Sequence, residues 1–98
     1  MSEITFVTTI TKFKAKVGAE AQLVAALRDF DNSNSESWQI ISVGENIYGA
    51  INTYTSIEKR TEDVVVGMKW LDSISHLLEY FDDGSRTEAF SGIVLHKG

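Results

Sequence analysis

The sequence has no cysteine, no proline and only two histidines among its 98 residues. The absence of cysteine excludes disulfide bonds, thiolate zinc sites, iron–sulfur clusters and a cysteine nucleophile, and it fits a reducing cytoplasm. No run approaches the roughly 20 apolar residues that a membrane span needs, and residues 1–5 have no basic, apolar leader. We therefore predict a cytoplasmic protein without a membrane segment.

Basic residues are also scarce, since 9 Lys and Arg stand against 14 Asp and Glu, for a net charge of -5. The densest basic group is Lys12, Lys14 and Lys16 at alternate positions, with no glycine-rich loop beside it. This balance argues against nucleic-acid binding, which depends on clustered Lys and Arg. The length fits one domain over residues 1–98, with a modest core.

The spacing of apolar residues predicts an alternation of strands and helices. Runs of β-branched and aromatic residues favour strands, and they cover residues 3–13, 37–43, 46–55 and 86–96. Apolar residues at helical spacing predict helices over residues 19–30 and 56–81, the second with Ser56 as its N-cap. Gly67 lies on the apolar side of this second helix, where we expect close backbone packing.

The predicted order is βαββαβ, which is typical of an α+β, ferredoxin-like fold with a four-stranded antiparallel sheet and two helices on one face. The uncovered face of such a sheet should be polar if water covers it. Neither face is clearly polar here, since Tyr48 and Tyr54 lie on one face of the third strand and isoleucines on the other. This pattern predicts a sheet-to-sheet homodimer, the alternative being a monomer with some exposed aromatic residues.

The element order resembles the dimeric α+β barrel superfamily, especially its antibiotic-biosynthesis-monooxygenase-like group. The similarity covers nearly the whole chain, including residues 10–20, where a strand runs into a helix led by Gly18, and the late strand at residues 90–94. The resemblance implies homodimers that bind small, often aromatic, molecules between sheet and helices. Some members oxidise these molecules with O2 and without metal or flavin, whereas others degrade haem.

A haem-degrading protein of this shape would be expected to use an Asn on the first strand and a Trp and a His on the second helix. The sequence supplies Trp70 and His76 but no Asn between Met1 and Phe30. On a helical wheel His76 lies opposite the apolar side and should face solvent. We therefore predict no haem, metal or other cofactor.

The candidate ligand-binding residues are large or polar side chains on the predicted strands and the second helix. They are Trp38, Tyr48, Asn52, Tyr54, Arg60 and Trp70. An amide in the middle of a strand needs partners if it is buried, so Asn52 either contacts a ligand or is satisfied by neighbours. Likewise, Arg60 fits an anionic ligand or an ion pair, and Trp70 fits a pocket wall or the core.

Three functions fit these residues. The first is a small-molecule-binding domain that oxidises an aromatic or quinol-like substrate without a cofactor. The second is a dimeric ligand-binding module without chemistry, and the third is a dimeric scaffold with a filled core. A cavity lined by Trp38, Tyr48, Asn52 or Trp70 would favour the first two over the third.

Overall fold

The computed structural model describes residues 5–97, which form a four-stranded antiparallel sheet with two α-helices. The elements are β1 (Val7–Lys14), α1 (Glu20–Asp29), β2 (Ser37–Gly44), β3 (Ile47–Tyr54), α2 (Ile57–Ile74), the short 3-10 helix η1 (Ser75–Leu77) and β4 (Thr87–Ile93). The sheet order is β2-β3-β1-β4, so the predicted ferredoxin-like fold is confirmed. Neither α-helix in this part of the chain is long and apolar enough to cross a membrane.

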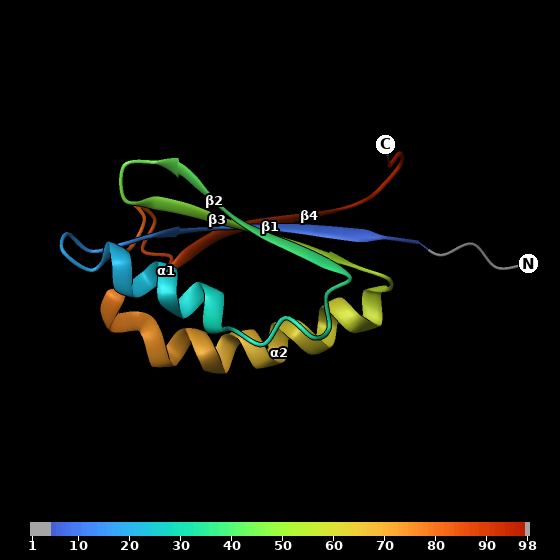
Figure 1. Ribbon diagram of the computed structural model, residues 1–98, viewed down its shortest axis with the longest axis horizontal. Helices are drawn as coiled ribbons and strands as arrows, with labels where there is room; N and C mark the ends of the chain where they lie inside the picture. The colour runs from blue at the N-terminus through green and yellow to red at the C-terminus, as the bar shows by residue number, and fades with distance from the viewer. Residues whose placement is uncertain (1–4, 98) are drawn as a thin grey trace, which may run out of the picture.

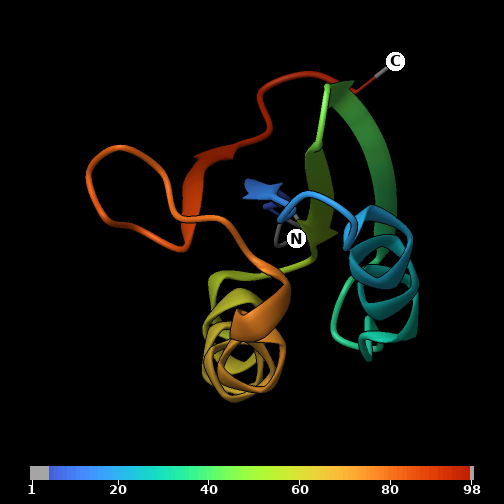
Figure 2. The same cartoon turned by 90° about the vertical axis from the view of Figure 1, so that its left-hand side faces the viewer.

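Both helices cover the same face of the sheet, with α1 beneath the β2 side and α2 beneath the β4 side (Figures 1 and 2). Side chains alternate along β1 and the residue after it, so that Phe13 and Ala15 reach the core. Leu23 and Leu27 on α1, four residues apart, bury the same side of that helix. Burying a leucine side chain contributes roughly 1.5–3 kcal/mol to folding.

The second helix is shorter than its apolar spacing predicts, because the chain leaves it to pair with the end of β1. Ser56 caps the helix as predicted, since its side chain accepts a hydrogen bond from the Lys59 amide at 3.2 Å. At the other end α2 stops at Ile74, and Leu78 forms a β-bridge with Ala15. The predicted end at residue 81 is therefore wrong, because long-range pairing overrides local helical spacing.

The first and last strands also differ slightly from their predicted bounds. The predicted start at Glu3 lies outside the described residues, and regular pairing begins at Val7. The Phe6 carbonyl still accepts a hydrogen bond from the Val94 amide at 2.9 Å. The strand predicted for residues 86–96 is β4, which ends at Ile93.

The sheet face opposite the helices carries a row of side chains that crosses all four strands. Gln39, Ile51, Ile10 and Phe90 are successive partners in this row. Phe90 is 65% exposed. In the next row Lys12 lies 3.4 Å from Glu88, so this part of the face has no net charge. We call this surface, opposite the helices, the open face. It includes Gln39, Ile51, Ile10, Phe90, Lys12 and Glu88.

Candidate functional site

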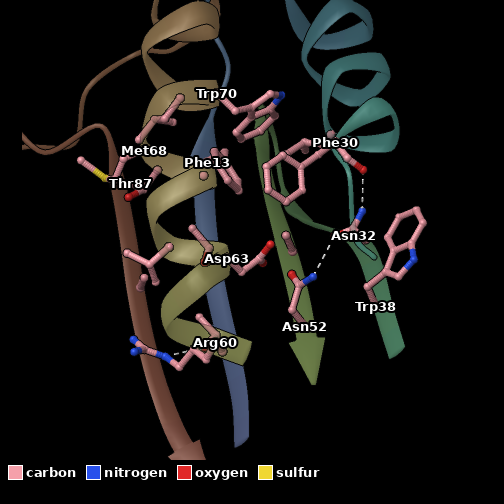
Figure 3. Close-up of a pocket in the computed structure, with 18 of the residues that line it drawn as sticks. Phe13, Phe30, Asn32, Trp38, Asn52, Arg60, Asp63, Met68, Trp70 and Thr87 are labelled. Atoms are coloured by element: carbon pink, nitrogen blue, oxygen red, sulfur yellow. Dashed lines mark hydrogen bonds between the residues drawn. The ribbon is translucent and has the colours of Figure 1, made fainter. Parts of the chain in front are cut away.

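A cavity of about 310 Å³ lies between the inner face of the sheet and the two helices. This volume is at the lower end of the range for small-molecule sites. Its aromatic walls come from β1, the end of α1, β2 and α2 (Figure 3). They are Phe13, Phe30, Trp38 and Trp70. Trp70 packs edge-on against Phe30, with 4.9 Å between ring centroids, so the walls offer flat apolar surface to a planar ligand.

Asn52 connects the cavity to the loop between α1 and β2. Its Nδ2 donates to Asn32 Oδ1 at 2.9 Å and to Ser35 Oγ at 2.8 Å. Asn32 in turn donates to the Phe30 carbonyl at 3.0 Å, which ties the loop to the aromatic wall. The Asn52 carbonyl oxygen accepts no hydrogen bond from residues 5–97, and it is therefore available to a ligand donor.

Arg60 places a cationic group at the edge of the cavity. Its Nε donates to Thr9 Oγ1 at 3.2 Å and to Ser91 Oγ at 3.0 Å, which fixes the side chain against β1 and β4. No carboxylate within the described part of the chain lies within ion-pair distance of Arg60. The guanidinium charge is thus not neutralised by a local partner, and it can stabilise negative charge on a ligand.

The most buried charged group of the site is Asp63 on α2, which is 7% exposed. Its Oδ2 accepts a hydrogen bond from the Tyr54 hydroxyl at 2.5 Å, whereas its Oδ1 has no partner among residues 5–97. Figure 3 shows the carboxylate directed from α2 toward Asn52 and Phe30. Leaving a buried acceptor unpaired is unfavourable, by roughly 1–3 kcal/mol.

Burial is the main cause of the ionisation behaviour of this pair. It raises the pKa of Asp63 above its usual value, while the side chains of Tyr54 and Asn34 partly oppose the increase. Burial and the bond to Asp63 also raise the pKa of Tyr54, so this hydroxyl stays protonated and donates. A buried carboxylate with a raised pKa in a cavity is typical of functional sites.

The raised pKa of Asp63 predicts that stability decreases as pH rises. Between the pKa of Asp63 in the unfolded state and its higher pKa in the folded state, the folded state binds more protons than the unfolded state. The free energy of unfolding therefore falls as pH rises through this interval and stays at the lower value at higher pH. We expect Asp63→Asn to be more stable than wild type by about 1 kcal/mol near pH 7 and equal to it near pH 4. Urea unfolding across this range checks the difference, and a less stable variant at neutral pH would contradict it.

The structure brings together five of the six candidate ligand-binding residues. Trp38, Asn52, Tyr54, Arg60 and Trp70 all line the cavity, although their binding roles stay predictions.

Tyr48 is the exception. It shares the inward face of β3 with Asn52, but it lies at the other end of the strand, opposite Phe13, and packs against the core. Tyr48 does not line the cavity, and its binding role stays a prediction. His76, expected to face solvent, is exposed.

Sequence reasoning missed Asp63, which looks like a solvated carboxylate near a helix start. The signal was nevertheless present, because Asp63, Gly67, Trp70 and Ile74 follow at spacings of four, three and four residues. These positions form one stripe of a helix, so a carboxylate among them is expected to face inward.

Gly67 does not make the close backbone contact that its position predicts. A Cβ atom at this residue would lie 4.0 Å from Phe30 Cζ, which is an ordinary van der Waals distance, and would meet no other atom within 4 Å. Gly67 lines the cavity. The missing side chain therefore leaves space between α2 and Phe30 open.

Comparison with known proteins shows similarity in structure but not in sequence. No protein-family model matches the chain, and no curated protein matches it. A protein of unknown function from Nitrosomonas europaea superposes with a TM-score of 0.79 at 16% identity, covering 99% of this chain and 96% of that one. A proposed antibiotic biosynthesis monooxygenase from Chloroflexus aurantiacus gives 0.72 at 13% identity, covering 95% and 96%.

A second proposed antibiotic biosynthesis monooxygenase, from Nitrosomonas europaea, superposes with a TM-score of 0.75 at 10% identity, covering 98% of this chain and 95% of that one. The chain thus shares its fold, over nearly its full length, with these three structures, two of which are proposed antibiotic biosynthesis monooxygenases. Proposed monooxygenases and proteins of unknown function share this fold, and identities this low establish the fold alone.

Proposed function

We propose that this chain binds a small aromatic molecule in the cavity and oxidises it with O2 without a metal or flavin, a quinol-like substrate being the best fit. The observation that carries the proposal is the combination of aromatic walls with three polar groups in one cavity of about 310 Å³. Planar apolar walls suit an aromatic ring, and a few placed polar groups orient it.

Two of the three polar groups, Arg60 and Asn52, have complementary roles in this proposal. Arg60 supplies positive charge that stabilises an anionic form of the substrate, and Asn52 offers its carbonyl oxygen to a substrate donor. The aromatic walls exclude water from the ring, which strengthens these electrostatic interactions. The substrate anion is the species that would react with O2, so stabilising it in the cavity favours the oxidation.

Oxygen uptake with 1,4-naphthohydroquinone tests the oxidation. We expect uptake above the uncatalysed rate with wild type, and a rate lower by roughly threefold to tenfold with Asn52→Ala, which removes the cavity amide. Thr53→Ala is the matched control, since Thr53 is the next residue of β3 and lies on the other side of the sheet, where it bonds Thr8. If wild type and Asn52→Ala are equally inert, the proposed oxidation is wrong.

We also propose that the open face pairs with the open face of a second copy. Apolar side chains of adjacent strands line up across it, and Phe90 extends into solvent. The pair formed by Lys12 and Glu88 neutralises the charge of the row beside Phe90, so this row adds no repulsion between two copies of an acidic chain. A contact that places the same surface on both subunits is the usual geometry of a homodimer.

A further inference from the structure

Among residues 5–97, Asp63 has the one fully buried side-chain polar atom without a hydrogen-bond partner. Tyr54 satisfies Oδ2 and thereby holds the carboxylate plane in place, while Oδ1 has no partner in the described residues. A native protein rarely retains a buried, unpaired carboxylate oxygen for stability, because apolar replacement removes the penalty. An incoming ligand group that donates a proton would complete the bonding.

We propose, building on the proposed function, that Asp63 recognises a hydroxyl group on the aromatic ligand and accepts its proton. The hydroxyl donates to the carboxylate, and when the O–H bond breaks, the proton moves to Asp63, leaving a neutral carboxyl group and a ligand oxyanion. Atoms and charge balance in this transfer, which needs no other reactant. Tyr54 is a positioning residue in this transfer, because its hydroxyl donates to Oδ2 and so orients the carboxylate.

The polar and charged groups in the neighbourhood of Asp63 come from three parts of the fold. Tyr54 on β3 donates to it, Arg60 lies one turn earlier on α2, and Asp31 and Asn34 belong to the loop between α1 and β2. Burial and the negative charge of Asp31 both raise the pKa of Asp63, which makes it a better proton acceptor than an exposed aspartate. Arg60 supplies the positive charge that favours an oxyanion and disfavours a cationic ligand in the same cavity.

The test compares three ligands that share a naphthalene ring: 2-naphthol, 2-methoxynaphthalene and 2-(aminomethyl)naphthalene. We expect wild type to bind 2-naphthol about tenfold more tightly than the methyl ether, because only the hydroxyl donates a charge-assisted hydrogen bond. In Asp63→Asn this ratio should fall to about twofold or less, since the amide oxygen accepts from Tyr54 and the amide nitrogen, which cannot accept, is left toward the ligand. Isothermal titration calorimetry measures all three affinities.

Asp72→Asn is the matched control for the loss of a carboxylate. Asp72 is on the same helix but pairs with Arg86 away from the cavity, so this variant should keep the wild-type ratio.

A second readout uses unmodified protein. The ratio of the two affinities should fall toward one as pH drops below the raised pKa of Asp63, because the protonated carboxyl no longer distinguishes hydroxyl from ether.

The outcomes separate this inference from the function on which it rests. If wild type binds naphthol and its ether equally well, the cavity takes aromatic ligands but Asp63 does not recognise a hydroxyl. If the amine binds most tightly and loses its affinity in Asp63→Asn, the carboxylate recognises a cation and the inference is wrong. If no naphthalene ligand binds, the proposed function fails and the role of Asp63 fails with it.

Discussion

Replacing Phe90 by aspartate is expected to convert a dimer of this chain into monomers. Phe90 is 65% exposed in the single chain, so a polar side chain there should barely change the stability of one subunit. In the proposed dimer the same side chain is buried beside Ile10, and an aspartate would become an unpaired charge in an apolar contact. We expect association to weaken by roughly a hundredfold or more.

Native mass spectrometry at micromolar protein measures the effect, and it also detects any small molecule that is purified with the chain. Val65→Asp is the control, because Val65 is 59% exposed but lies on α2, away from the open face. Wild type and the control should show the mass of two subunits, and Phe90→Asp the mass of one. A single-subunit mass for wild type would mean that the open face is exposed to water in solution.

Most strands and helices could be predicted because each one is marked by a pattern among residues close together in the sequence. Alternation along β1 brings Phe13 inward, and the four-residue spacing of Leu23 and Leu27 marks the buried side of α1. The end of α2 was not predictable in this way. Leu77 and Leu78 continue the helical spacing, but the bridge between Leu78 and Ala15 joins residues far apart in the sequence, which no local pattern reveals.

The site was predictable to the extent that its residues share a face of one element. Strand alternation places Asn52 and Tyr54 on the inward face of β3, and both line the cavity. The same alternation does not say how far along the strand the cavity extends, and Tyr48 packs against the core without lining the cavity. The pairing of Tyr54 with Asp63 depends on how α2 packs against β3, which only the three-dimensional structure specifies.

Substituting Gly67 by leucine is expected to close the cavity while leaving the fold intact. The position meets only Phe30 Cζ, at 4.0 Å, so a larger side chain has room to enter the space that a ligand would occupy. Leucine also favours a helix over glycine, and we expect the free energy of unfolding to rise by about 1 kcal/mol. Binding of 2-naphthol should weaken by roughly a hundredfold or more, because the ligand and the leucine cannot share the volume.

Gly67→Ala separates the helical effect from the steric one, since a single methyl group reaches only van der Waals contact with Phe30. It should gain about the same stability as the leucine variant and keep naphthol affinity within roughly threefold of wild type. Urea unfolding and calorimetry on the three proteins supply both quantities. A leucine variant that binds naphthol like wild type would place the ligand outside this cavity, whereas one that unfolds more easily would show that the space beside Phe30 is already filled. Greater stability combined with lost binding would mean that glycine is present at this position to leave room for a ligand, because the helix itself gains from any larger residue there.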